Sequence, residues 1–156
     1  MKAFSPDDLN WLQGFIHREI PVTHLMNIHV IGQSESGGLQ VSAPLEGNHN
    51  DKGTGFAGSQ STLLTIAGWA QISLWLRQCG IAADVMIFDC SLSFKLPAKG
   101  DMISEVTWDE DMQWSKLEDA LSRKGRGRIE LNILMKVDGE IVSEQVARYA
   151  IIKKSA

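Results

Sequence analysis

A loop rich in glycine and asparagine holds the residues of this chain whose types and spacing suit chemistry. It spans residues 47–58, and the segment that follows has no charged side chain before Arg77. Such a segment predicts a helix, Gly58–Leu76, that is buried in the fold. Its first backbone N–H groups would be free to bind a developing oxyanion. These N–H groups belong to Ala57, Gly58 and Ser59.

The same loop contains one carboxylate that could act on a bound carbonyl. Asp51 could activate water as a general base or attack directly, and Gly53 would let the backbone approach a bulky ligand. The alternative is that Asn50 and Asp51 only form an Asx turn that closes the loop. His49 could orient a substrate or exchange protons, or it could be an ordinary solvent-exposed loop histidine.

Two other interpretations of this region are weaker. The glycines at 53, 55 and 58 spell G-x-G-x-x-G, but no strand leads directly into them and position 73 is Ser, where a dinucleotide site needs an acid. Polar residues from Gln60 to Ser73 argue against a membrane span. We therefore expect neither a dinucleotide cofactor nor a membrane segment.

Composition excludes further classes. The chain has 156 residues, 44% hydrophobic, enough for one domain with a core, and its net charge of -4 argues against nucleic-acid binding. Cys79 and Cys90 lack metal or redox spacing and are expected to be reduced core residues in a cytoplasmic protein. His24 and His29 would face opposite sides of a strand, so no metal site is expected.

The flanking sequence predicts an α+β fold. Ser5 caps a helix that Pro21 ends, and alternating residues at 26–30 and 39–45 predict a hairpin. After the central helix, Val85–Leu96 and Met102–Trp108 predict a second strand pair. Within Val85–Leu96 the apolar side chains alternate strictly, which predicts that they share one face. Those side chains are Met86, Phe88, Cys90, Leu92, Phe94 and Leu96.

The last third of the chain predicts a third hairpin. An amphipathic segment, Trp114–Ser122, precedes strands at Arg128–Val137 and Ile141–Ile152, which are joined by the strong turn signal Asp138-Gly139. One uncharged helix among antiparallel strands indicates a curved sheet wrapped around that helix.

Several of these residues together resemble a known family. The motifs are Ala43-Pro44-Leu45, the run from Asn50 to Ser59, Ala67-Gly68-Trp69 and the basic run 123–128. They are similar to the YiiD_C family, a hotdog-fold domain described as a putative thioesterase. The resemblance implies a hotdog homodimer, or a dimer of dimers, that acts on acyl thioesters across a groove between subunits.

Hotdog thioesterases of the phenylacetate-degradation type give a second comparison. Their loop reads Asn-x-x-Gly-x-x-His-Gly-Gly, with a catalytic Asp on the helix. Asn50, Gly53 and Gly58 match this pattern, and Ala57 replaces a glycine. Phe56 stands at the position of the His. Thr65 stands at the position of the Asp, where its hydroxyl could orient a water.

The chemistry of the loop and the resemblance together suggest roles for the candidates. Asn50, Asp51 and Thr65 would form the catalytic group, and the substrate-binding residues would be Gly53, Phe56, Ala57, Gly58 and Ser59. Arg126, within the basic run, would hold coenzyme A or acyl carrier protein as part of the substrate, or belong to a solvated loop; no separate cofactor is expected. Two alternatives stay open: a non-catalytic domain that binds acyl thioesters or a partner, and a hotdog hydratase or dehydratase.

Overall fold

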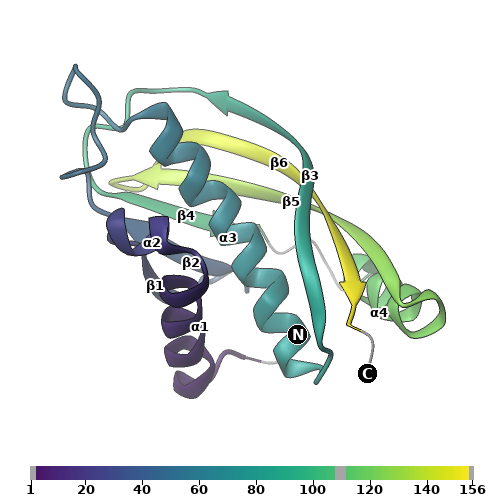
Figure 1. The fold of residues 1–156 in the computed structure, drawn as a ribbon. Coiled ribbons are helices and arrows are strands. Elements are labelled where there is room, and N and C mark those ends of the chain that lie inside the picture. The colour runs from purple at the N-terminus through teal and green to yellow at the C-terminus, as the bar shows by residue number, and fades with distance from the viewer. Residues whose placement is uncertain (1–2, 108–111, 155–156) are drawn as a thin grey trace.

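The computed structural model describes residues 3–107 and 112–154. Its centre is one long helix, α3 (Ala57–Gln78), lying on a curved sheet of six antiparallel strands (Figure 1). The strands follow the order β1-β2-β4-β5-β6-β3 across the sheet. Their bounds are His29–Gln33 (β1), Leu39–Ala43 (β2), Ala83–Phe94 (β3), Met102–Val106 (β4), Arg126–Val137 (β5) and Glu140–Lys153 (β6).

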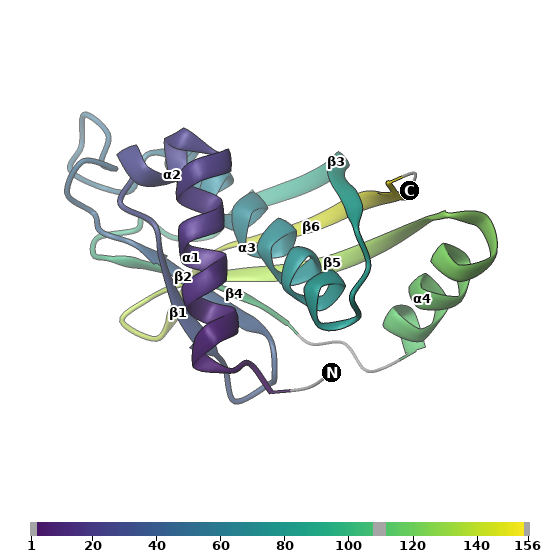
Figure 2. The same ribbon diagram turned by 60° about the horizontal axis from the view of Figure 1, so that its bottom comes forward.

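Three shorter helices complete the fold. They are α1 (Pro6–Glu19), α2 (Pro21–Leu25) and α4 (Met112–Lys124). Turning the molecule shows α1 on the same face of the sheet as α3, and α4 apart from both at the end where β5 begins (Figure 2). The prediction of an α+β fold with a sheet wrapped around one helix is confirmed.

The predicted burial of the central helix is confirmed. Every residue from Gln60 to Leu76 is buried or half-buried, because the sheet covers one side of α3 and α1 packs against another. The helix begins at Ala57 and extends to Gln78, slightly beyond the predicted bounds. At Gly68 the helix lies so close to the sheet that an added Cβ would meet Tyr149 and Ile133. The small side chain lets α3 lie directly on β6.

The first helix begins as predicted, and its end differs. Ser5 caps α1 through a reciprocal capping box with Asp8, which satisfies two N–H groups of the first turn. Pro21 ends α1 but also occupies the first turn of α2, where its missing N–H costs nothing. The strand predicted from Met26 therefore starts only at His29. The placement of His24 on a strand was wrong.

The predicted pairing of the two strands after the central helix was also wrong. β3 pairs with β6 at the sheet edge, whereas β4 lies between β2 and β5. The connecting chain passes beside the β5–β6 turn, where Gly100 approaches Val137. Two strands joined by a short connection usually pair with each other. Here the connection instead carries the chain from β3 at the edge of the sheet to β4 between β2 and β5. The end of the second predicted strand, at Trp108, lies outside the described residues.

The strict alternation predicted along β3 is interrupted by a bulge between Ile87 and Asp89. Ile87, Cys90 and Leu92 pair with β6 residues that face α3, whereas the Phe88 ring lies under Arg128 on the other face. The apolar residues of β3 therefore do not share one face. Cys79 and Cys90 form no disulfide within the described residues, and both are exposed, so the prediction that they are core residues was wrong.

The last hairpin is confirmed. β5 and β6 pair along their full lengths around Asp138 and Gly139, whose φ angles are 49° and 82°. Two positive φ values in succession are typical of the tight turn that Asp-Gly favours. Across the described ranges, no helix is both long enough and apolar enough to span a bilayer.

Candidate active site

The loop before α3 is built around the side chain of Asn50. Its Oδ1 accepts hydrogen bonds from the backbone N–H groups of Lys52 (2.9 Å) and Thr54 (3.2 Å), and its Nδ2 donates to Thr54 Oγ1 (3.0 Å). Gly53, with φ 71°, completes the reversal. The Asx turn considered from the sequence is therefore present at Asn50, and the side chain acts first as a structural element of the loop.

A second asparagine fixes the loop to the fold. Asn48 is 2% exposed, and its Nδ2 donates to the carbonyl oxygens of Met26 and Pro44, each at 2.9 Å. The backbone carbonyl oxygen of Asn48 accepts a hydrogen bond from Phe56 N at 2.8 Å, and Gly55 N donates to Ala98 O at 2.7 Å. The start of α3 is thereby held against the rest of the molecule.

The first N–H groups of α3 have no partner within the helix. Phe56 is the N-cap residue and supplies no side-chain hydrogen bond, and the first helical bond runs from Gln60 N to Phe56 O. The N–H groups of residues 57–59 precede that bond and are among those that helix geometry leaves without an internal partner. The Phe56 ring, 53% exposed, covers Gly58, where a Cβ would meet it.

A cavity of about 370 Å³ opens at this helix start. Asn50, Ala57 and Gln60 line one side, and the end of β3 with residues 95–97 lines the other. Gln60 donates to Gly55 O (2.8 Å) and accepts from Ser143 Oγ (3.0 Å), which ties the helix start to β6. The cavity thus brings together Asn50 and Ala57 of the predicted set.

Asp51 lies apart from this cavity. Its carboxylate is 78% exposed and pairs with the neighbouring Lys52 at 2.9 Å. Within one protomer, the predicted base therefore faces solvent rather than the helix start.

Thr65 lies two turns along α3, against β6. Its Oγ1 accepts a long hydrogen bond from Gln145 Nε2 (3.4 Å), and its backbone carbonyl accepts from Tyr149 Oη (3.0 Å). Burial raises the pKa of Tyr149, so this hydroxyl keeps its proton. Gln145 is 1% exposed, and its Oε1 has no hydrogen-bond partner among the described residues.

Sequence reasoning missed these polar groups of β6. Ser143, Gln145 and Tyr149 alternate along the strand and all face α3. The signal was available in part, because Gln60 and Thr65 in an uncharged helix each require a buried hydrogen-bond partner.

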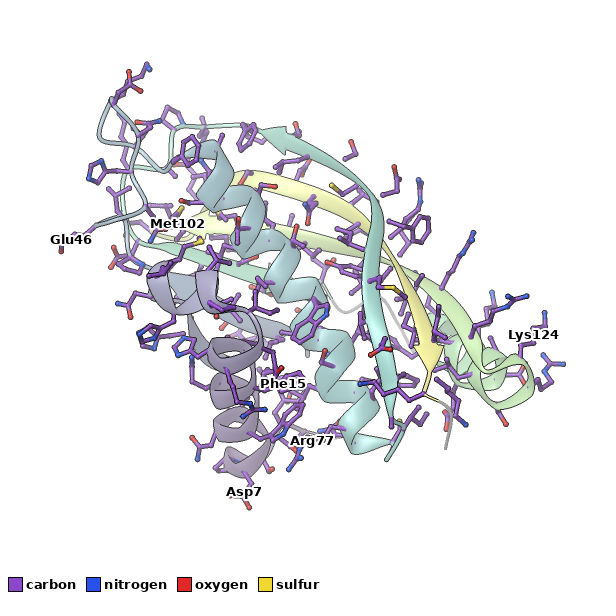
Figure 3. The ribbon with its side chains drawn as sticks, viewed as in Figure 1. Asp7, Phe15, Glu46, Arg77, Met102 and Lys124 are labelled. Atoms are coloured by element: carbon purple, nitrogen blue, oxygen red, sulfur yellow. The ribbon has the colours of Figure 1, made fainter. Side chains whose placement is uncertain are left out.

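Arg126 lies at the opposite end of the molecule from the loop. With Lys124 and Arg128 it lines a separate cavity of about 610 Å³ between α4 and the ends of β5 and β6. Figure 3 shows the distance between these regions, with Glu46 beside the loop and Lys124 on α4 at the far end. Within one protomer, the structure does not bring Arg126 to the predicted site.

The histidines are distributed differently from the prediction. His17 of α1 lies between His24 and His29, with ring centroids 5.2 and 6.4 Å away. His17 Nε2 lies 2.8 Å from Ile28 O, so this ring links α1 to the chain entering β1. His49 lies 3.1 Å from the carbonyl oxygen of Asn50 and belongs to the loop itself.

A family model described as "Putative thioesterase" (YiiD_C) matches residues 9–153. Solved structures agree with it. A putative thioesterase from Shewanella oneidensis is 26% identical, with a TM-score of 0.85 over 95% of this chain and 99% of that one. A probable thioesterase from Pseudomonas aeruginosa is 22% identical, with a TM-score of 0.80 over 97% and 99%.

A thioesterase from Haemophilus influenzae extends the similarity to lower identity. It is 13% identical, with a TM-score of 0.72 over 97% of this chain and 93% of that chain. At that identity the likeness concerns the fold, which is the hotdog fold.

Proposed function

Because this chain belongs to the YiiD_C family of putative thioesterases, we propose that it hydrolyses acyl thioesters of coenzyme A or acyl carrier protein. The observation that supports this most directly is the start of α3. N–H groups without a side-chain cap lie there beside a cavity that also contains Asn50. Such donors can stabilise the negative charge that develops on a thioester carbonyl oxygen under attack.

The chemistry requires a nucleophile as well as an oxyanion site. We assign activation of water to Asp51, the carboxylate next to Asn50, and orientation of water to Thr65. Because Asp51 faces solvent and Thr65 lies two turns along α3 in one protomer, both roles depend on assembly with a second subunit. Hydrolysis adds the water oxygen to the acyl carbon while a proton passes to the base. The C–S bond then breaks, and the base returns the proton to the departing thiolate. Gln145 of β6 would fix the orientation of the Thr65 hydroxyl, since its Nε2 donates a hydrogen bond to Thr65 Oγ1.

Assembly as a homodimer would complete the site. β3 is the longest unpaired edge of the sheet, with hydrogen-bonding partners on one side only. It exposes Ile87 (36%), Phe88 (49%) and Phe94 (50%). An exposed apolar edge of this length favours association unless it is covered. Pairing of β3 with its copy across a two-fold axis would cover it, and a dimer of dimers could follow.

The same pairing would change the surroundings of the loop. Antiparallel pairing places the end of one β3 beside the start of the other, and Arg126 lies two strands in from that start. The basic side chains of one subunit would then approach the loop of its partner. There they could hold the phosphates of coenzyme A or the acidic surface of a carrier protein.

A thioester-release assay tests the proposal. A panel of acyl-CoAs and acyl carrier proteins is incubated with the protein, and free thiol is measured against buffer alone. Hydrolysis above background supports the enzyme. Binding without hydrolysis would instead favour an acyl-binding domain, a possibility supported by Thr65 at the position of the usual acid. Turnover of enoyl substrates without thiol release would favour a hydratase.

A further inference from the structure

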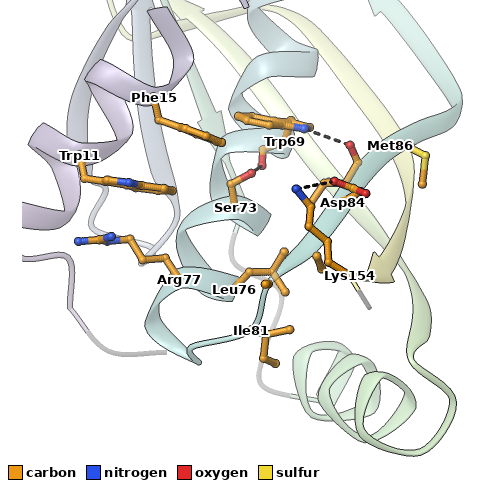
Figure 4. A pocket seen from close by; sticks show the side chains of 13 residues that line it. Trp11, Phe15, Trp69, Ser73, Leu76, Arg77, Ile81, Asp84, Met86 and Lys154 are labelled. Atoms are coloured by element: carbon orange, nitrogen blue, oxygen red, sulfur yellow. Dashed lines mark hydrogen bonds and ion pairs between the residues drawn. The ribbon is translucent and has the colours of Figure 1, made fainter. Parts of the chain in front are cut away.

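A third cavity, of about 530 Å³, lies between α1, α3 and the start of β3 (Figure 4). Three aromatic rings form one wall. Trp11 stacks on Phe15 with centroids 4.8 Å apart, and Phe15 stacks on Trp69 at 5.5 Å, with interplanar angles of 14° and 13°. Ile81 and Val85 contribute to the opposite side. The volume is in the range of small-molecule sites.

Two polar side chains of α3 at this cavity, Trp69 and Ser73, already have protein partners. Trp69 Nε1 donates to Val85 O at 3.2 Å, and Ser73 Oγ donates to Trp69 O at 2.9 Å. Neither side chain therefore has an unused N–H or O–H donor to offer a ligand, and this wall of the cavity is mainly hydrocarbon.

The cations at the rim are also paired. Arg77 lies 4.6 Å from the centroid of the Trp11 ring and 3.4 Å from Asp8, and Lys154 lies 3.1 Å from Asp84. A charged ligand group would have to displace one of these carboxylates. An uncharged hydrocarbon group would meet no such competition, so the lining favours it.

The position of the cavity relates it to the proposed site. β3 begins at this cavity, with Ala83 in its lining, and ends at the cavity by the start of α3, with Phe94 in that lining. Pairing of β3 with its copy about the strand centre would set residue 83 opposite residue 94. The loop of one subunit would then face the aromatic cavity of the other.

We propose that the cavity beside Trp11, Phe15 and Trp69 binds an aliphatic acyl chain whose thioester carbonyl lies at the start of the partner's α3. This inference rests on the proposed function. A flexible chain suits this lining, because the walls are mainly hydrocarbon and the cations at the rim are already paired. Each methylene withdrawn from water adds about fourfold to affinity, so length should govern turnover until the cavity is full.

The test uses a series of straight acyl-CoAs of increasing length. For the wild type, kcat/KM should rise about fourfold per methylene and then level off. Ser73→Leu adds bulk to the cavity wall, so the plateau should begin at a shorter chain. Ser122→Leu makes the same change on the exposed surface of α4 and should leave the profile unaltered.

A second variant with the opposite expected effect keeps the test valid if Ser73→Leu fails to fold. Trp69→Leu enlarges the cavity, so its plateau should begin at a longer chain. A length profile that neither variant moves would overturn the inference while leaving thioester hydrolysis intact.

Direct binding separates this inference from the proposed function. Decanoate is titrated into each protein and the heat is measured. The wild type and Ser122→Leu should bind it alike, whereas Ser73→Leu should bind at least about tenfold more weakly, the loss expected for roughly two methylenes. If decanoate binds in this pattern but no thioester is hydrolysed, the cavity is an acyl-binding site and the proposed function is refuted. If all three proteins bind decanoate equally, the proposal that this cavity binds acyl chains is refuted.

Discussion

At the scale of single residues, the two candidates for water activation differ sharply in their surroundings. The Asp51 carboxylate is mostly in solvent beside Lys52, whereas the Thr65 hydroxyl is held by Gln145 against β6. A carboxylate can accept a proton from water and a threonine hydroxyl cannot do so at neutral pH. We therefore assign the base to Asp51 and an orienting role to Thr65.

Substitution of these two residues should give a ranked loss of activity. Asp51→Asn preserves the shape of the side chain but removes the base, so kcat should fall roughly 100-fold or more with KM little changed. Thr65→Val should cost less, because it removes one hydrogen bond to the water. Steady-state kinetics on a good acyl-CoA measure both. The opposite ranking would assign the chemistry to the helix position instead.

Close contact between α3 and the sheet depends on Gly68. A Cβ at this position would meet Tyr149 and Ile133, so Gly68→Ala should destabilise the protein by about 1–3 kcal/mol. Tyr149→Phe in the same chain should recover part of this loss, because it removes the oxygen nearest the added methyl. Thermal unfolding measures both changes.

A matched control for Gly68→Ala exists on α1. Gly14 is also helical but has no neighbour within 4 Å of an added Cβ, so Gly14→Ala should stabilise by about 0.5–1 kcal/mol. Equal effects at the two glycines would show that helix propensity, and not contact with β6, sets the cost.

At the scale of elements, the sequence predicted every described strand and the burial of α3, because each depends on local periodicity and turn residues. It did not predict that β3 pairs with β6 rather than β4, since that pairing depends on the crossover of the whole chain. The bulge after Ile87 likewise has no local sequence signal. For the site, the sequence located the loop and the helix start, but the β6 partner Gln145 became visible only in three dimensions.

The central strands contain a partly buried ion pair, Glu105 with Lys136, whose effect on stability depends on pH. Glu105 of β4 is 7% exposed. Burial raises the pKa of its carboxyl, but hydrogen bonds from Lys136 (3.0 Å), Gln40 (3.1 Å) and Ser36 (3.1 Å) outweigh burial and lower the pKa overall. The stabilisation from ionised Glu105 is therefore complete above its usual pKa of 4.5 and is lost as the pH falls through the lower value in the folded state.

Replacing Glu105 with a neutral residue should make the free energy of unfolding depend less on pH in the acid range. Glu105→Gln should be less stable than the wild type near neutral pH, by about 1–3 kcal/mol, and the difference should shrink as the pH falls below 4.5. Urea unfolding at a series of pH values measures it. Glu118→Gln, an exposed change on α4, should leave the curve unchanged. A constant difference between Glu105→Gln and wild type at every pH would contradict the assignment.

At the scale of the whole molecule, we propose that the unpaired edge of β3 governs assembly. Ile87 lies near the middle of the strand and is 36% exposed, so in a two-fold pair it would lie close to its own copy. Ile87→Lys should therefore place two ammonium groups together and convert a dimer to the 17.2 kDa monomer. Light scattering at micromolar concentration measures the mass. Ile31→Lys, at a more exposed position (47%) on the opposite edge strand β1, should remain dimeric. A wild-type monomer would refute the proposed assembly.

A mixed dimer tests whether each site combines the loop of one subunit with the aromatic cavity of the other. Asp51→Asn disables the loop, and Ser73→Leu disables the cavity for long acyl chains, so neither homodimer should hydrolyse a long-chain thioester efficiently. In a mixed dimer isolated through two different affinity tags, a shared arrangement leaves one site with both parts intact and the other with both defective. Activity should then return to about half of the wild-type value per dimer. If each subunit instead used its own loop and its own cavity, both sites would retain one defect, and the mixed dimer would stay as inactive as its parents.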